Sequence, residues 1–542
     1  MNTLNNGRGW ADGLPGAIGL LICLLLSACA SAPTAIPATV TPVPTIVPTF
    51  TAIPVPDPFC QNDFVVADGD GGLMCRPTRL PYRFIGINVR ELAYLADQNP
   101  ALNRSDVYRV DLTGANPGII QRQLETASQM GAKVVRIFAP RFYDVNSSIH
   151  SLDDVIAADD RLLAVSSLLE EHHRIQPLKY LIVFTDFYAA PPSFNVYNLH
   201  CPGYSANDFS DPFCYLKVGE PPHLRPEWFS HDYAQPTFGE GSYRQYVARL
   251  IEHYNSVVTI PLSENDPQGI HVIGSAVTST QIDPMQIMAW ELGNELKVDQ
   301  PEEAVPVMQQ FVQDMACLIH QTDRYPRLVS SGFVSTFHAT NGQGHDPAVL
   351  YDLRCADGRA ALDLGTIHVY NNQWWLPRAV VVPHNERNFS DRLDQYVDYR
   401  WFAAQKRPYI VEELGFTGGY HEVAGQHCID GSYSSGDTIW SGDATRGDGS
   451  GQDTLLPRTD ITRGPAVAAA LDRFFELKAS GVMPWAFQAG TADLMMHDAC
   501  RGLDPLYHTD WNDLFKAYCQ KARQLDQRPL TCALTDYQSQ TP

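Results

Sequence analysis

Two glutamates at the ends of apolar runs could act together, one as an acid and the other as a nucleophile. Glu295 ends the run WELGNE at 290–295, and Glu413 lies in VEELG at 411–415. Each belongs to a short apolar stretch with the composition of a buried strand. Two carboxylates can cleave a glycosidic bond, because one protonates the leaving oxygen while the other attacks the anomeric carbon. Taken singly, either glutamate could instead be a structural member of an ion pair.

The elements that must position these glutamates alternate along the chain. Eight short apolar runs are expected as strands buried on both faces, at 82–88, 133–138, 179–185, 286–292, 326–331, 363–369, 408–412 and 481–487. Helix patterns lie between them, at 117–130, 151–172, 241–257, 302–321, 389–405 and 464–479. This alternation predicts an α/β fold, a single (β/α)8 TIM barrel over 59–542, with a doubly wound open sheet as the alternative. No glycine-rich phosphate loop follows a strand, so nucleotide binding has no support.

In such a barrel, chemistry sits at the C-terminal ends of the strands. Glu295 and Glu413 then lie at the mouth, and facing strands can hold two carboxylates at the ~5–5.5 Å of a retaining glycosidase. Two further glutamates compete by type. Glu291 lies four residues before Glu295, deeper in the barrel, and Glu412 should point away from Glu413 because side chains alternate along a strand. We expect both to be structural.

The two strand ends resemble glycoside hydrolase family 5, a retaining family that includes β-mannanases and cellulases. That family carries Asn-Glu at the end of barrel strand four and Glu-aromatic-Gly at the end of strand seven. The resemblance runs in order over roughly 80–515 through short motifs. It implies that Glu295 is the general acid/base and Glu413 the nucleophile. It also implies that Asn294 hydrogen-bonds the 2-hydroxyl of the sugar in the cleavage subsite.

Other positions match the same family. Arg136, in VVRIF, resembles the arginine beside the nucleophile, and a cation there would keep Glu413 ionised. A lone arginine inside an apolar strand is costly unless it is paired. The run His368-Val369-Tyr370 resembles the family His-x-Tyr, which implies that Tyr370 hydrogen-bonds Glu413 and that His368 lies near the acid or the sugar. Taken alone, a histidine in a strand is more often a satisfied core residue.

Tryptophans supply candidate sugar platforms. Trp485 resembles the tryptophan that forms the floor of the cleavage subsite, with a core tryptophan as the alternative. Trp374 follows the His368 strand and could form a distal platform or simply cap the barrel. The sequence departs from the family at Leu296, where proline is common, and at Leu414, where an aromatic residue is common. Neither change removes a catalytic group, but both bear on the substrate.

The substrate class follows from the run 288–295 (MAWELGNE), which is most similar to the β-mannanase branch. The resemblance therefore implies retaining hydrolysis of β-1,4-mannan or glucomannan, with cellulose or another β-glucan second. Transglycosylation would use the same residues. The alternative from another class is a non-catalytic carbohydrate-binding lipoprotein on a decayed barrel. Such a protein would have lost a carboxylate, and both are present here.

The amino-acid composition excludes several classes of binding partner. The 542 residues include 39 Lys+Arg against 61 Asp+Glu, a net charge of −22, which argues against nucleic acid and against an acidic polysaccharide. The hydrophobic share of 44% excludes wholesale disorder. A neutral β-linked polysaccharide or oligosaccharide fits this charge. No Cys/His cluster has zinc spacing, so we expect no metal and no cofactor. We expect a monomer.

The N-terminal region is predicted to be a targeting segment. The apolar run 17–28 ends in Leu26-Ser27-Ala28-Cys29, which resembles the lipobox of bacterial lipoprotein signal peptides. A plain secretory signal or an uncleaved anchor is the alternative, and all of these export the domain. Residues 1–28 are thus the expected signal, and 29–58 form a Pro/Thr-rich spacer. The membrane is then contacted only through a lipid on Cys29.

Ten cysteines remain after the signal region, an even number that suggests disulfides in an exported protein. Connectivity cannot be deduced from sequence, but neighbours in the chain offer one pairing. It joins Cys60–Cys75, Cys201–Cys214, Cys317–Cys355, Cys428–Cys500 and Cys519–Cys532.

Overall fold

The structure is a computed structural model. It describes residues 58–89, 104–105, 110–111, 119–138, 152–185, 229–235, 242–261, 279–298, 301–340, 346–370, 397–415, 420–423, 426–429, 463–485, 487–488, 495–496 and 505–532. All of them belong to the second of two units of the chain, Pro56–Pro542. The predicted signal, Cys29 and nearly all of the spacer lie outside the described residues. Within the described part, no helix is long and apolar enough to cross a membrane.

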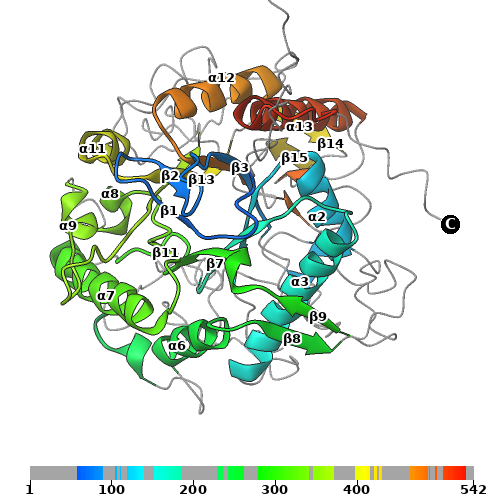
Figure 1. Ribbon diagram of the computed structural model, residues 1–542. Helices are drawn as coiled ribbons and strands as arrows, with labels where there is room; N and C mark the ends of the chain where they lie inside the picture. Colours follow the sequence, from blue (N-terminus) through cyan, green and yellow to red (C-terminus); the bar gives the residue numbers. More distant parts are fainter. Residues whose placement is uncertain are drawn as a thin grey trace, which may run out of the picture. The chain divides into compact units, whose positions relative to one another are not determined.

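Eight parallel strands form the central sheet (Figure 1). They are β3 (Phe84–Asn88), β6 (Val134–Phe138), β7 (Lys179–Val183), β10 (Ile287–Glu291), β11 (Leu328–Ser330), β12 (Gly365–Tyr370), β13 (Tyr409–Gly415) and β16 (Gly481–Pro484). Each pairs with its neighbour in chain order, and β16 pairs with β3. A parallel bridge between Ser330 and Leu364 joins the two remaining edges. The sheet is therefore closed, which confirms the predicted (β/α)8 barrel and excludes the open sheet.

Helices surround the strands (Figure 1). They are α2 (Ile119–Gln129), α3 (Leu152–Glu171), α6 (Tyr243–His253), α7 (Pro301–Thr322), α8 (Thr336–Ala339), α9 (Ala348–Tyr351), α11 (Val397–Gln405), α12 (Arg463–Glu476) and α13 (Pro505–Asp526). Local signals explain their ends: α2 stops before Gly131, whose φ is +81°, and α6 starts with a capping box between Ser242 and Gln245. All six predicted helices are present, and α13 was not predicted.

Short antiparallel strand pairs and 3-10 turns lie outside the eight-stranded sheet. The antiparallel pairs are β1 (Val65–Ala67) with β2 (Leu73–Cys75), β4 (Arg104–Ser105) with β5 (Val110–Asp111), β8 (Val258–Pro261) with β9 (Ser279–Ile282), β14 (Tyr420–Val423) with β15 (Gln426–Ile429), and β17 (Phe487–Gln488) with β18 (Met495–Met496). The 3-10 turns are η3 (Asp232–Ala234) and η5 (Pro284–Gln286).

The lower half of the barrel interior, toward the N-terminal ends of the strands, is apolar. Phe84 and Met483 fill it, and they leave no room for a side chain at Gly481 or Gly86. The hairpin β1–β2 belongs to the same buried cluster. It is tied to the strand ends by Lys179, whose Nζ donates to the carbonyl of Asp63 at 2.9 Å. This end of the barrel is therefore sealed by packing.

Three of the predicted disulfides are present: Cys60–Cys75, Cys317–Cys355 and Cys519–Cys532. The other two predicted pairs, Cys201–Cys214 and Cys428–Cys500, fall outside the residues whose side chains are described, so they stay predictions. The confirmed bridges close short loops at the periphery of the barrel, where they limit the freedom of the unfolded chain.

Candidate active site

A tight turn after β10 presents Glu295. The backbone N–H of Asn294 donates to the carbonyl of Thr185 at 2.8 Å, and that of Glu295 donates to the carbonyl of Gly332 at 2.8 Å. Thr185 and Gly332 follow β7 and β11, so the turn is held between the strands that flank β10. Glu295 has a φ of +53°, in the left-handed region that a residue with a Cβ adopts at a cost. The surrounding hydrogen bonds impose this backbone on a glutamate.

An irregularity in β13 presents Glu413. Along the pair of β12 with β13, Ile367 faces Val411 but His368 faces Glu413, so Glu412 is an extra residue in the ladder. The prediction that Glu412 points away from Glu413 is therefore wrong. Alternation fails at the bulge, and both carboxylates reach the same side chain: Glu413 Oε2 is 3.2 Å from His368 Nδ1, and Glu412 Oε2 is 3.4 Å from His368 Nε2.

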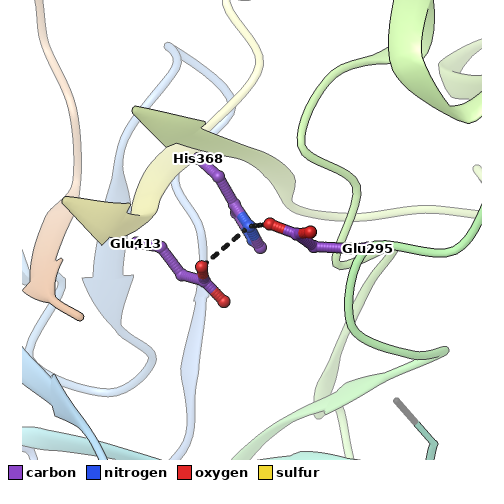
Figure 2. Close-up of side chains that lie close together, drawn as sticks. All are labelled: Glu295, His368 and Glu413. Atoms are coloured by element: carbon purple, nitrogen blue, oxygen red, sulfur yellow. Dashed lines mark hydrogen bonds and ion pairs between the residues drawn. The ribbon is translucent and has the colours of Figure 1, made fainter. Parts of the chain in front are cut away.

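His368 joins the two predicted catalytic carboxylates. Its Nδ1 lies 2.8 Å from Glu295 Oε1, and Figure 2 shows Glu295, on a loop, and Glu413, on a strand, converging on this ring. One oxygen of each glutamate and a ring nitrogen of His368 all lie within 4.8 Å of one another. The three side chains are buried, with Glu295 keeping 8% of its surface exposed. The sequence-predicted pair is thus brought together at the mouth of the barrel.

Arg136 lies beneath this group and is completely buried. Its Nη1 donates to Glu413 Oε1 and to Asn88 Oδ1, both at 2.9 Å. Its Nη2 donates to Glu291 Oε1 at 2.5 Å and to Asn294 Oδ1 at 2.8 Å, and its Nε donates to Glu291 Oε2 at 3.1 Å. All five N–H groups of the guanidinium are used. The arginine therefore holds the carboxyl group of Glu413 in place, and its effect on the charge of Glu413 stays a prediction.

Burial and mutual contact set the protonation of the group. Burial alone would lower the pKa of Arg136 and of His368, but the surrounding glutamates raise both well above their usual ranges. Burial raises the pKa of Glu291 well above its usual range, and Glu412 adds to this rise against the opposing effect of Arg136. Burial would also raise the pKa of Glu412, yet Arg136 and His368 hold it below its usual range. These opposite directions favour a proton on Glu291 over one on Glu412.

The structure places the predicted residues as follows. Arg136 contacts Glu413 and Asn294, and His368 contacts both Glu295 and Glu413. Trp485 is 9% exposed and meets Phe138 edge-on at 6.0 Å, at the barrel mouth. Tyr370 ends β12, but its side chain lies outside the described residues. Trp374 lies outside them as well, so both roles stay predictions.

Sequence reasoning missed Asn88. It ends β3, and its Nδ2 donates to the carbonyls of Glu412 at 2.7 Å and Pro484 at 3.0 Å, while its Oδ1 accepts from Arg136. The amide therefore spans β3, β13 and β16 beneath the site. The one signal for it was a polar residue at the end of an apolar strand, FIGIN, at the level where the other functional groups sit.

Glu295, His368 and Glu413 also have the donor atoms of a metal site. The electrostatics oppose that use, because a metal-bound histidine must give up its proton at the coordinating nitrogen. Here Nδ1 faces two carboxylates, and the pKa of His368 is raised well above its usual value. Arg136 already occupies Glu413 from the other side. The arrangement fits proton transfer and attack by a carboxylate better than it fits cation binding.

The chain matches no protein-family model and no curated protein. Among solved structures it is similar to the endo-β-1,4-mannanase of Thermotoga petrophila, with 16% identity, 82% of this chain and 77% of that chain covered, and a TM-score of 0.45. It is similar to the glycoside hydrolase family 5 mannosidase of Rhizomucor miehei, with 15% identity, 87% and 100% covered, and a TM-score of 0.48.

A third similar structure is the β-glucanase of Saccharophagus degradans in complex with cellotetraose. It is 12% identical, with 88% of this chain and 99% of that chain covered and a TM-score of 0.40. The family that the sequence motifs resemble is thus among the similar structures. Because these three TM-scores lie below 0.5, the function is argued from the geometry of the site.

Proposed function

We propose that this protein is a retaining glycoside hydrolase that cleaves a neutral β-linked polysaccharide by double displacement. The observation that carries the proposal is the approach of Glu295 and Glu413, whose nearest donor oxygens lie within 4.8 Å at the mouth of a barrel. Retaining enzymes hold their two carboxyl groups at ~5–5.5 Å, whereas inverting enzymes leave ~6.5–9.5 Å for a water. The short separation leaves no room for that water and supports attack by a carboxylate.

Each residue has a step to perform. Glu413, held ionised by Arg136 at 2.9 Å, attacks the anomeric carbon, and the bond to the leaving oxygen breaks as Glu295 gives that oxygen its proton. The product of this step is an ester between the sugar and Glu413. Glu295 then takes a proton from water, the water oxygen bonds to the anomeric carbon, and Glu413 leaves as a carboxylate. His368 contacts both glutamates throughout.

For the substrate we propose β-1,4-mannan or glucomannan, with cellulose or another β-glucan second. The support is the similarity of 288–295 to the mannanase branch, together with the net charge of −22, which disfavours an anionic polymer. Trp485 and Asn294 are the proposed sugar contacts within the described residues. Tyr370 and Trp374 are proposed to add contacts at the mouth.

The test is hydrolysis by the domain from residue 59 onward, on a panel of mannan, glucomannan, a soluble cellulose derivative and β-1,3-glucan. Glu295→Ala and Glu413→Ala run beside the wild type, and Glu170→Gln serves as a matched control because it changes a buried glutamate at the end of α3, remote from His368. We expect activity on the mannans that both alanine variants lose and the control keeps. Activity on a glucan alone would retain the mechanism and replace the substrate.

A non-catalytic sugar-binding protein would give a different result on the same panel. It would bind polymer, hydrolyse none, and keep its binding in both alanine variants. The anomeric configuration of the first product, followed by NMR, separates retention from inversion independently of the substrate. An inverted product would overturn the double-displacement mechanism.

We also propose that the domain is exported in a bacterium and anchored by a lipid on Cys29, with 29–58 as the spacer and no other membrane contact. The lipobox-like run before Cys29 supports this. Mass spectrometry of the full chain expressed in a bacterial host measures the lipid directly. We expect a diacylated Cys29, lost in Cys29→Ser, whereas an unmodified and released chain would favour a plain secretory signal.

A further inference from the structure

We propose that Glu412 is a positioning residue that keeps Nε2 of His368 protonated, so that Nδ1 shares a proton with Glu295. The contact that motivates this is the approach of Glu412 Oε2 to His368 Nε2 at 3.4 Å, on the side of the ring opposite Glu295. The kinetic part of the inference rests on the proposed hydrolase function. The part about the charge of the ring does not.

The donors and acceptors around the two ring nitrogens of His368 determine where its protons lie. A neutral imidazole has one donating and one accepting nitrogen, whereas an ionised carboxylate only accepts. Each ring nitrogen of His368 faces carboxylate oxygens: Nδ1 lies 2.8 Å from Glu295 and 3.2 Å from Glu413, and Nε2 lies 3.4 Å from Glu412. If Glu412 is ionised, Nε2 must donate to it. The remaining proton then lies between Nδ1 and Glu295, on the atom that the reaction uses as its acid.

The surroundings of the second oxygen, Oε1, favour the ionised form of Glu412. Among the described residues, Glu412 Oε1 is buried and accepts no hydrogen bond from a fixed donor, and the nearest cation atom, Arg136 Nε, is 3.7 Å away. A proton on Glu291 can supply the missing donor, because the two carboxyl groups are in hydrogen-bonding contact. A proton on Glu412 itself would instead leave Nε2 of His368 facing a carboxyl group that need not accept from it.

Among the described residues, three carboxylates and one histidine act on the charge of His368. Glu295 approaches from the turn after β10, and Glu412 and Glu413 approach from β13. His338 on α8 is close enough to interact, and burial lowers its pKa to about 3, so it adds no positive charge there at neutral pH. Glu412 is therefore the carboxylate that contacts the ring without being a reacting group.

Only the bulge in β13 makes this contact available. In a regular strand, Glu412 would point to the helix side of the sheet while Glu413 faced the barrel. The extra residue in the ladder turns Glu412 inward, against the far nitrogen of the ring. Removing its charge should weaken the hold on both protons of the His368–Glu295 pair.

The test compares Glu412→Gln with Glu412→Asp and Glu291→Gln. Glutamine removes the charge at nearly constant shape, aspartate keeps it, and Glu291→Gln replaces a carboxyl that already carries a proton in the same cluster. We expect the alkaline limb of the pH profile of kcat/KM to fall by about one pH unit in Glu412→Gln. It should stay close to wild type in the other two variants, even if their rates drop.

A uniform loss of rate in Glu412→Gln, with the alkaline limb unmoved, would overturn the proposal, because a purely structural role predicts that pattern. A second readout needs no substrate: NMR of labelled histidine, with His368→Asn to assign the signal. We expect Nε2 of the wild-type ring to stay protonated at about pH 8, and Nδ1 to share a second proton with Glu295 at this pH, well above the pKa of a free histidine. We expect this shared proton to be lost at lower pH in Glu412→Gln.

The two readouts separate the failure of this inference from the failure of the proposed function. If the wild type hydrolyses nothing, the NMR titration still decides, and an unchanged titration in Glu412→Gln overturns the inference. If Glu412→Gln does not fold, the wild-type spectrum decides instead. A ring whose Nε2 carries no proton at about pH 8 would overturn the inference.

Discussion

The two ends of the barrel treat buried charge in opposite ways. At the N-terminal end, Lys133 Nζ pairs with Asp526 at 2.7 Å, and Lys179 donates to backbone carbonyls, so each cation has its own partners. At the C-terminal end, four carboxyl groups surround two cations: Glu291, Glu295, Glu412 and Glu413 share Arg136 and His368.

This difference indicates that the N-terminal end of the barrel serves stability and that the C-terminal end is arranged for chemistry. A buried charge with its own partners recovers much of its cost of burial, whereas an excess of carboxyl groups must take up protons or raise the pKa of its neighbours. The C-terminal end holds such an excess, and Glu295 adds a left-handed backbone to it. This end combines shifted pKa values with a left-handed backbone at one of its carboxylates, as expected of a site that moves protons.

Replacing Arg136, the cation that the carboxyl groups share, should have the largest effect on stability and activity. In Arg136→Met, Glu291, Glu412 and Glu413 lose the cation that they share, and we expect the protein to lose about 3–5 kcal/mol of stability. Hydrolysis should be lost as well. Urea unfolding at neutral and mildly acidic pH measures the effect, and the deficit should shrink as the carboxylates take up protons. Arg136→Lys is the control, and a deficit independent of pH would contradict this account.

Opening a cavity tests the apolar half of the same barrel. Met483 packs against Gly86 one layer below Arg136, and Met483→Ala should destabilise the protein by about 3 kcal/mol. The catalytic groups lie outside its contacts, so the pH profile of hydrolysis should keep its shape. Met483→Leu, which conserves volume, should cost less than about 1.5 kcal/mol. A shifted pH profile in Met483→Ala would show that the two halves are coupled.

A pH-dependent stability is expected at the N-terminal end, from Glu170. Burial raises the pKa of Glu170 to about 7, against the backbone N–H of Leu178, which lowers it. Below its unfolded pKa both states are protonated and stability is full. Between that value and about 7 the unfolded state ionises first, so stability falls, by on the order of 2 kcal/mol. Above about 7 it levels off.

The measurement for Glu170 is the difference in unfolding free energy between wild type and Glu170→Gln across this pH range. Glutamine can still accept from Leu178 but does not ionise. We expect the variant to be relatively more stable at high pH than at low pH. A difference that stays constant with pH would rule out Glu170 as the source.

The smallest effect concerns the strain at Glu295. Glu295→Gly should abolish hydrolysis yet be about 1 kcal/mol more stable than Glu295→Ala, because only glycine adopts a φ of +53° without a steric cost. Chemical denaturation of the two variants gives this difference directly, and the lost carboxylate is common to both. Equal stabilities would mean that the turn relaxes and that Glu295 stores no strain.

Much of the barrel was predictable because its signals are local. All eight strands are recognisable in the sequence as short apolar runs. Six helices are recognisable as periodic patterns with their own start and stop residues. Three disulfides join cysteines that are neighbours in the sequence. The helix α13, which packs on α12, was missed.

The sequence by itself determined the order of the strands and the residue types at their ends, because each depends on a few adjacent residues. Only the tertiary structure decided how those ends meet. Arg136 and Glu413 are 277 residues apart and in direct contact. The inward turn of Glu412 and the left-handed backbone of Glu295 depend on register between strands and on hydrogen bonds to distant carbonyls. These are set by packing across the whole barrel, which no local stretch encodes.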